Sequence, residues 1–240
     1  MRSAEIWTYN DDDLQLRGEI YRPDTAANGG AVLVVHEADG IGGNVREHCA
    51  RLARLGYIAA AADMHGGGRV LDGKQMQAAL DAFHADPTLI RRRVRAALDA
   101  LHAQDGVDTD RMAAIGFCFG GTAVLELARS GAPLAAVASF HGLLTTAAPA
   151  RHGDIKARIL AATGALDPLV PPEDVTLFQE EMRSAGADWH LLTHGRALHS
   201  YTNQAVAGLG DPRMAYDAFA HRLSWAALTT FLDEAMALRG

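Results

Sequence analysis

Cysteine, aromatic residues and positive charge are all scarce in this sequence. Only two of the 240 residues are cysteine, Cys49 and Cys118, too few for a disulfide framework or a Cys-x-x-Cys metal pair, so we expect free thiols. Lysine and arginine number 22 against 29 acidic residues, and the net charge of −7 lacks the basic field of a nucleic-acid-binding protein. The one basic run, RRRVR at residues 91–95, is predicted to be the solvent-facing side of a helix.

The amino-terminal stretch lacks a long apolar run. Residues 1–14, MRSAEIWTYNDDDL, carry charge with no hydrophobic segment behind it, which is typical neither of a signal peptide nor of a transmembrane helix. We therefore expect a cytoplasmic protein with no membrane partner. No linker or block of charge divides the chain, so we expect one domain over residues 1–240. Hydrophobic residues make up 49% of the chain and aromatic residues only 6%, which suits a sheet covered by alanine-rich helices.

Apolar runs typical of buried strands alternate with helical patterns along the chain. Six such runs lie at residues 31–37, 57–63, 112–117, 134–142, 158–167 and 188–195. Residues 14–23 alternate apolar and polar side chains and end at Pro23, which predicts an antiparallel edge strand. This order predicts an α/β fold with a mostly parallel central sheet and helices on both faces.

Helices are expected between these strands. They are predicted at residues 45–56, 76–86, 89–104, 173–186 and 211–238, and a further one follows residue 118. In the first, one face carries Val45, Cys49, Leu52 and Leu55, and Gly56 suits the end of the helix. Cys49 is therefore predicted to be a buried core thiol, because free cysteine packs as a small hydrophobic residue.

The segment IGFCFGG at residues 115–121 has the glycine spacing of a nucleophile elbow. In such an elbow a strand turns so tightly into a helix that the central side chain projects clear of the backbone. The central residue here is Cys118, where serine is usual. A thiol at this place lies at a helix N-terminus, which favours the thiolate. By itself the motif is also explained by a structural turn without chemistry.

Two further residues follow in the order found in α/β-hydrolases. Asp167 ends an apolar strand, where a carboxylate can orient a histidine. His199 lies in a loop beyond the next strand, a suitable place for an acid and base. Each alone is explained by a turn cap or an exposed histidine, but the order nucleophile, acid, histidine at strand ends predicts a catalytic set of Cys118, Asp167 and His199.

A glycine-rich loop, HEADGIGGN, follows the strand at residues 31–37. In α/β-hydrolases this loop supplies one backbone N–H to the oxyanion hole and the residue after the nucleophile supplies the other. The expected donors are Ala38 and Phe119. Glu37 is harder to explain, because a carboxylate there opposes the developing negative charge, and a side chain turned to solvent explains it equally well. His36 is expected to be structural.

The residues together resemble the dienelactone hydrolase family, also called carboxymethylenebutenolidases. The matching segments are HE at 36–37, GYIAAAADMHG at 56–66, GFCFGG at 116–121, ATGALDPLVP at 162–171 and ALHSYTN at 197–203. The resemblance implies a three-layer α/β-hydrolase fold and a Cys118/His199/Asp167 triad. It implies hydrolysis of an ester or lactone through an acyl-thioester, with no metal or cofactor. It also implies that Glu37 hydrogen-bonds the resting thiol, takes its proton when substrate enters and swings aside.

The sequence departs from the dienelactone specialists of this family, which bind a substrate carboxylate with arginines. One of these lies four residues beyond the histidine, where this chain has Asn203, and the region before residue 75 offers only Arg69 and Lys74. A neutral amide cannot replace a bidentate guanidinium, so we expect a neutral ester or lactone to be the better substrate. The candidate substrate-binding residues, each also explained by packing, are Met64, His65, Phe83, Tyr201 and Asn203.

Two other functions fit the same residues. A thioesterase or other acyl-transfer enzyme would use the same triad and differ only in substrate. A non-catalytic small-molecule-binding or thiol-sensing protein is disfavoured by the intact triad, and a sensor would need a resolving cysteine, for which Cys49 is poorly placed. The 11 histidines include no HExxH zinc motif. The expected partner is a small ester or lactone, and either a monomer or a homodimer is expected.

Overall fold

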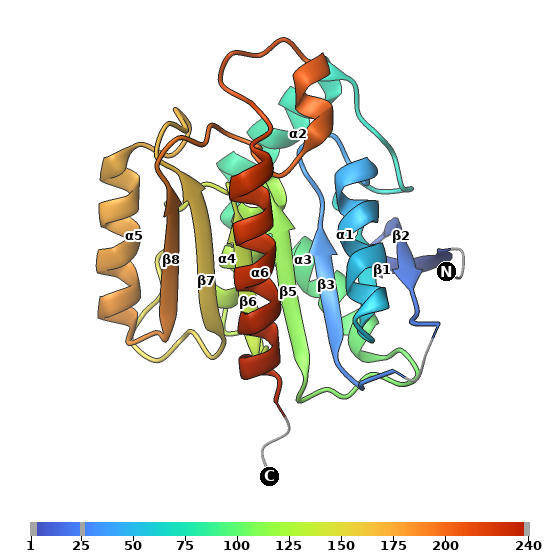
Figure 1. Cartoon of the computed structure of the whole chain (residues 1–240). Helices are drawn as coiled ribbons and strands as arrows, with labels where there is room; N and C mark the ends of the chain where they lie inside the picture. The colour runs from blue at the N-terminus through green and yellow to red at the C-terminus, as the bar shows by residue number, and fades with distance from the viewer. Residues whose placement is uncertain (1–3, 25–26, 238–240) are drawn as a thin grey trace.

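The structure, a computed structural model, describes residues 4–24 and 27–237. An eight-stranded sheet lies at its centre (Figure 1). In chain order the strands are β1 (Glu5–Asp11), β2 (Leu14–Tyr21), β3 (Ala31–Val35), β4 (Ile58–Ala62), β5 (Met112–Phe117), β6 (Ala136–Phe140), β7 (Arg158–Gly164) and β8 (Trp189–His194). In space their order is β1-β2-β4-β3-β5-β6-β7-β8. β2 runs antiparallel to both neighbours and the other strand pairs are parallel, so the predicted mostly parallel sheet is confirmed.

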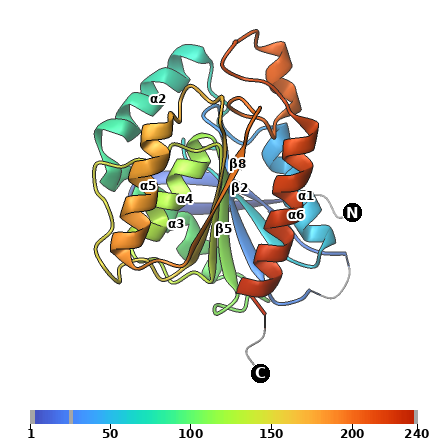
Figure 2. The same cartoon turned by 60° about the vertical axis from the view of Figure 1, so that its left-hand side comes forward.

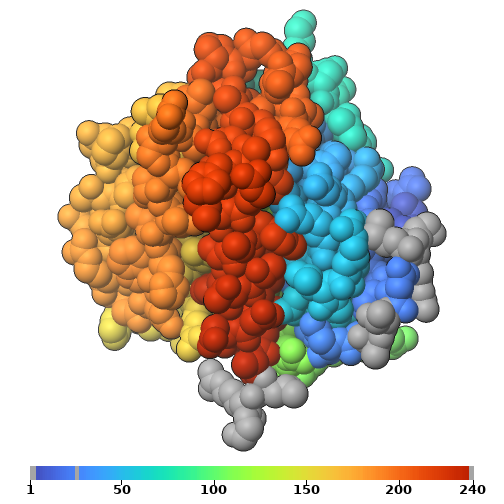
Figure 3. Space-filling model, viewed as in Figure 1, coloured from blue at the N-terminus to red at the C-terminus, as the bar shows by residue number. Residues whose placement is uncertain are grey.

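Helices cover both faces of the sheet (Figure 2). They are α1 (Gly43–Arg54), α2 (Gly73–Ala85), α3 (Pro87–His102), α4 (Phe119–Arg129), α5 (Pro172–Ala185) and α6 (Ala218–Ala235), together with a 3-10 helix, η1 (Gln204–Gly208). α1 and α6 lie side by side over one face (Figure 3), and α2 to α5 cover the other. The three-layer α/β arrangement is therefore the one expected from the sequence.

The inner strands are apolar at nearly every position, with Ser139 of β6 the polar exception in β3 to β6, because both of their faces are covered. All residues of β3, β4, β5 and β6 are buried, and β4 is an isoleucine followed by four alanines. Parallel strands buried on both sides need such continuous apolar runs rather than an alternating pattern. Cys49 on α1 is fully buried in the core under α1 and α6, as expected. Across residues 4–24 and 27–237, no helix has the length and apolar character needed to cross a bilayer.

Two elements differ from the sequence expectation. The strand predicted at the edge, β2, is flanked by β4 and by an additional strand, β1, in which Trp7, Tyr9 and Asp11 turn inward. The last helix, expected from residue 211, begins only at Ala218, because the Asp217 side chain accepts the N–H groups of the first turn and the preceding residues form a loop after η1. Its predicted end at residue 238 lies outside the described residues.

The basic run at residues 91–95 does not lie wholly on the solvent side of α3, so that prediction was wrong in part. Arg93 is only 8% exposed. Its guanidinium pairs with Asp11 at 2.6 Å and donates to the carbonyl oxygen of Met64 at 2.7 Å. The reason is that β1 and the end of β4 present a carboxylate and a carbonyl to this face, which satisfy a buried charge.

Candidate active site

Cys118 lies at a sharp turn between β5 and α4. Its backbone has φ 53° and ψ −120°, a left-handed conformation that a side chain rarely adopts. The flanking glycines permit the turn: a Cβ at Gly116 would lie 2.0 Å from the carbonyl oxygen of Gly120, and one at Gly120 would lie 2.2 Å from that of Val35. The strand, tight turn and helix that the motif predicts are therefore all present.

Cys118, His199 and Asp167 form a hydrogen-bonded chain. The His199 Nε2 atom lies 3.1 Å from the Cys118 Sγ atom, and the His199 Nδ1 atom lies 2.8 Å from an Asp167 Oδ2 atom. Asp167 is 3% exposed and His199 1%. Burial opposes the protonation of His199, but its hydrogen bonds with Asp167 and Cys118 outweigh this and raise its pKa to about 10. The arrangement joins a sulfur nucleophile to a base that a carboxylate orients.

The predicted oxyanion-hole donors come from adjacent strands. β3 and β5 are paired in parallel, with Val35 opposite Gly116, so the loop after β3 lies beside the turn after β5. Phe119 is the first residue of α4, where a helix leaves its N–H groups without an intrahelical partner. Ala38 lies in the loop after β3, and its carbonyl oxygen is 2.9 Å from the Nε2 atom of His65.

Glu37 lies in the same loop and is partly buried. One of its oxygens accepts a hydrogen bond of 2.7 Å from the Asn203 amide, and the other, Oε1, is a buried atom with no hydrogen-bond partner among the described residues. Burial and the nearby Asp39 carboxylate raise the Glu37 pKa to about 7. A hydrogen bond to the thiol, which the family resemblance implies, is not among the hydrogen bonds of the described residues; Glu37 pairs with Asn203 and the thiol with His199.

The model of the dienelactone hydrolase family matches residues 16–236 of the chain. The chain belongs to this family. This member is accordingly a dienelactone hydrolase-like enzyme of the α/β-hydrolase superfamily that acts on esters or lactones.

Solved structures and curated relatives agree with this membership. A dienelactone hydrolase-like promiscuous phosphotriesterase from metagenomic libraries is 39% identical, with a TM-score of 0.91 over 98% of this chain and 99% of that one. The protein m3DLH is 40% identical, with a TM-score of 0.92 over the same shares. An Escherichia coli O157:H7 protein provisionally named carboxymethylenebutenolidase is 28% identical over 81% of this chain and 73% of its own length.

Three of the residues predicted to bind substrate in this dienelactone hydrolase family member, Met64, Phe83 and Tyr201, have buried side chains. Met64 and Tyr201 are fully buried, and the Tyr201 hydroxyl is 2.9 Å from the Ser224 hydroxyl. Phe83 is 4% exposed, and its ring centroid is 4.9 Å from that of Phe119. Asn203, another of these candidates, donates its amide hydrogen bond to the Glu37 carboxyl group. Their role in binding substrate stays a prediction.

In this dienelactone hydrolase family member, His141 also lies at the site, although the sequence did not single it out. It follows β6, is fully buried and has φ 41°. The Cys118 N–H donates to the His141 Nδ1 atom at 3.0 Å, so the proton is on Nε2, which donates to the Thr202 hydroxyl at 2.8 Å. Burial and the neighbouring His199 keep the His141 pKa well below its usual range, so the ring is neutral. Its position at the end of a strand next to β5 was the available signal.

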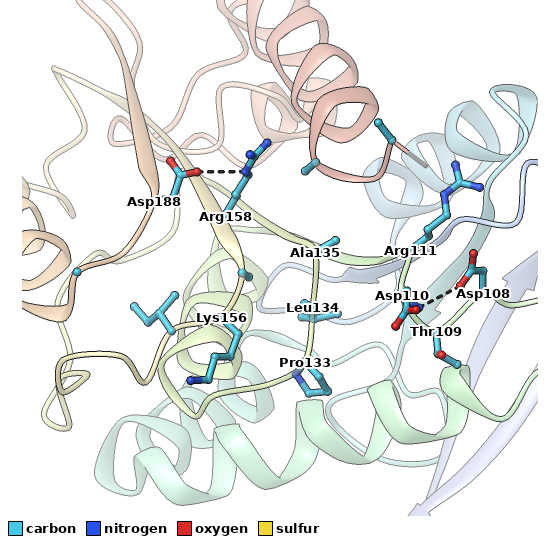
Figure 4. Close-up of a pocket in the computed structure, with 15 residues that line it drawn as sticks. Asp108, Thr109, Asp110, Arg111, Pro133, Leu134, Ala135, Lys156, Arg158 and Asp188 are labelled. Atoms are coloured by element: carbon cyan, nitrogen blue, oxygen red, sulfur yellow. Dashed lines mark hydrogen bonds and ion pairs between the residues drawn. The ribbon is translucent and has the colours of Figure 1, made fainter. Parts of the chain in front are cut away.

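A surface cavity of about 770 Å³ lies at the opposite end of the sheet (Figure 4). Its lining includes Arg111, Ala135 and Arg158, which stand at the beginning of β5, β6 and β7 rather than at their ends. Arg158 pairs with Asp188 across it at 3.1 Å. The cavity is thus separate from Cys118. Within the described part of the chain, no three side chains of histidine, cysteine, aspartate or glutamate form a group that could hold a metal ion.

Proposed function

We propose that the protein hydrolyses neutral esters or lactones by thiol catalysis, with Cys118 as the nucleophile, His199 as the acid and base, and Asp167 as the residue that orients the imidazole. The observation that carries this proposal is the hydrogen-bonded chain of 3.1 Å and 2.8 Å that joins the three side chains at the turn after β5. A raised His199 pKa supports a thiolate–imidazolium pair as the reactive form.

The reaction takes two steps. In the first, the Cys118 thiolate attacks the carbonyl carbon, the carbonyl electrons move to oxygen, and the Ala38 and Phe119 N–H groups bind the oxyanion. The tetrahedral intermediate collapses, the carbon–oxygen bond breaks, and the leaving alkoxide takes the proton from His199. In the second step a water molecule gives its proton to His199 and attacks the acyl-thioester, and the Cys118 thiolate leaves as the acid is released.

Glu37 controls the thiol in this proposal. In the resting enzyme its carboxylate hydrogen-bonds the Cys118 thiol, and when substrate enters it takes the thiol proton and moves aside. The hydrogen bond that Glu37 accepts from Asn203 supplies a partner for the displaced carboxyl group. A Glu37 pKa of about 7 supports proton exchange near neutral pH.

Substrates without a carboxylate fit this site best. Asn203 occupies the position of the family's substrate-binding arginine, and its amide already donates to Glu37. Arg69 donates to the carbonyl oxygens of His65 and Gly66. A negatively charged substrate would therefore meet the partly buried Glu37 and the nearby Asp39 without a guanidinium to offset them.

Mass spectrometry of the intact protein tests this proposal. The parent is exposed briefly to a panel of activated esters, lactones and acyl-thioesters, and we expect an adduct on Cys118 that Cys118→Ala abolishes. Cys49→Ala is the matched control, because Cys49 is fully buried on α1 and should leave the adduct intact. No adduct and no turnover above Cys118→Ala would rule out thiol catalysis, whereas adducts from thioesters alone would favour the thioesterase alternative.

Hydrolysis of neutral phosphotriesters is a second candidate activity. The observation that favours it is the 39% identity, over 98% of this chain, to a dienelactone hydrolase-like promiscuous phosphotriesterase. A neutral triester also suits a site in which Asn203 replaces a cationic side chain. We expect slow turnover of paraoxon by the parent and none by Cys118→Ala; equal rates in the two proteins would exclude it.

A further inference from the structure

The peptide group between Glu37 and Ala38 carries the proposed oxyanion donor, the Ala38 N–H, at one end and a bound carbonyl at the other. This carbonyl oxygen, on Glu37, receives hydrogen bonds from the His36 Nδ1 atom and, at 3.3 Å, from the Gly40 backbone N–H. The described peptide bonds are all trans, so the C=O and N–H bonds of this group point in opposite directions. Holding the Glu37 carbonyl therefore fixes the direction of the Ala38 N–H.

The tautomer of His36 follows from its two partners. The Met64 backbone N–H donates to the His36 Nε2 atom at 3.1 Å, so Nε2 carries no proton and Nδ1 carries it. The ring is fully buried, and burial together with the neighbouring His65 lowers its pKa to about 4. His36 is thus neutral near pH 7, with its one N–H directed at the Glu37 carbonyl.

His65 holds the next peptide group of the same loop. Its Nε2 atom faces the Ala38 carbonyl oxygen at 2.9 Å and therefore donates to it. The His65 backbone is itself anchored, because its N–H donates to the buried Asp63 carboxylate at 2.9 Å. The His36 and His65 rings lie 4.8 Å apart, so two adjacent imidazoles bind two consecutive carbonyls.

We propose that His36 and His65 form an imidazole clamp that positions the Ala38 N–H for the oxyanion. They are positioning residues, since each acts through the backbone and neither needs to touch the substrate. A donor that is already aimed where charge develops stabilises the transition state without reorganisation at that moment. The inference rests on the thiol mechanism proposed above, and it assigns a function to a histidine that the sequence suggested was only structural.

Asparagine and glutamine substitutions separate the clamp from simple packing. The amide nitrogen of asparagine occupies about the place of a histidine Nδ1 atom, and that of glutamine about the place of Nε2. His36→Asn therefore retains the donor to the Glu37 carbonyl, whereas His36→Gln loses it. At position 65 the preference is reversed, because His65 donates through Nε2. The clamp thus predicts opposite rankings of the same two amides at the two positions.

Two rates are measured for each variant: the acylation burst with p-nitrophenyl acetate and the alkylation of Cys118 by iodoacetamide. Alkylation needs the thiolate but creates no carbonyl oxyanion. Its rate therefore measures the reactivity of the Cys118 thiol independently of the oxyanion hole. Removal of a whole oxyanion donor costs about 10²- to 10³-fold, so we expect His36→Gln and His65→Asn to slow acylation by about tenfold or more. Alkylation should stay within about threefold of the parent in all four variants. Acylation by His36→Asn and His65→Gln should be at least about threefold faster than by His36→Gln and His65→Asn.

His48→Gln is the matched control for loss of a buried imidazole. His48 is 2% exposed and its Nδ1 atom also bonds a backbone carbonyl, that of Asn44, but this carbonyl belongs to α1 and not to the loop after β3. We expect its ratio of acylation to alkylation to equal that of the parent.

Three results would overturn the clamp: equal loss in both amides at each position, a parallel fall of acylation and alkylation, or the same change of ratio in His48→Gln. If the position-36 variants do not fold, the pair at position 65 decides in the same way. A parent that forms no acyl adduct would instead refute the thiol mechanism itself, so the two failures are distinguishable.

Discussion

Glu37→Gln should make the protein more stable above neutral pH. The partly buried Glu37 has a pKa of about 7, against an ordinary value of 4.5, because removal from water and then the Asp39 charge disfavour its ionised form. At about 1.4 kcal/mol per pKa unit, ionisation of Glu37 in the folded protein costs about 3 kcal/mol relative to the unfolded chain. Glutamine retains an oxygen that can accept the Asn203 hydrogen bond and carries no charge.

The sign of the pH dependence follows from linkage. Because the folded-state pKa lies above the unfolded one, the stability that Glu37 contributes is fully present below pH 4.5 and is lost as the pH rises through 7. Between pH 5 and pH 8 the loss amounts to about 2.5 kcal/mol. Relative to the parent, Glu37→Gln should therefore gain about this much free energy of unfolding over the same interval.

Urea unfolding of both proteins at pH 5 and pH 8, followed by circular dichroism, measures this difference. Glu126→Gln is the control, because Glu126 is a buried carboxylate that is paired, with Arg129 at 3.0 Å and Arg91 at 2.7 Å. Loss of a partner from a buried ion pair should cost on the order of 3 kcal/mol at both pH values. An equal effect of Glu37→Gln at pH 5 and pH 8 would refute the reasoning.

Three further predictions concern the same site. Asp167→Asn should lower kcat/KM for esters by about 10²- to 10⁴-fold, because the amide no longer holds the His199 tautomer; a loss of less than tenfold in steady-state assays would contradict it. Asn203→Arg should raise the ratio of kcat/KM for a carboxylate-bearing lactone over a neutral ester by about tenfold or more, since a guanidinium pairs with the carboxylate; an unchanged ratio would count against it. Gly116→Ala should lower the free energy of unfolding by about 3 kcal/mol or more, measured by urea unfolding, because its Cβ would lie 2.0 Å from a backbone oxygen of the turn.

The sequence predicted those features that a local pattern carries. The glycines at 116 and 120 imposed the turn at Cys118, and apolar runs placed Asp167 and His199 beyond strand ends. Because parallel strands bring their carboxyl ends to one edge of the sheet, Cys118 and His199 meet there although they are 81 positions apart. The order of most strands and helices along the chain was predicted too, because each has its own local pattern of apolar residues.

Features that depend on distant partners were not predicted. β1 is mostly polar, and its inward face is stabilised by the Arg93–Asp11 ion pair, which joins residues 82 positions apart. Asn203 meets Glu37 across 166 positions, so nothing local indicates that this amide holds a carboxyl group. His141 is a single histidine after a strand, and its partners, the Cys118 N–H and the Thr202 hydroxyl, lie 23 and 61 positions away.

The pairing of β3 with β5 fixes the catalytic part of the site, whereas the residue proposed to select the substrate lies on a separate segment. The Cys118 turn and the Ala38 loop follow strands locked in register at Val35 and Gly116. Asn203 lies in the segment between β8 and α6, which crosses above the ends of the strands in Figure 1. The backbone of His199 is bonded to Arg213 and Ala215, so these residues must stay fixed. Directed evolution confined to residues 203–210 would therefore alter the range of accepted molecules while the bond-breaking groups keep their places.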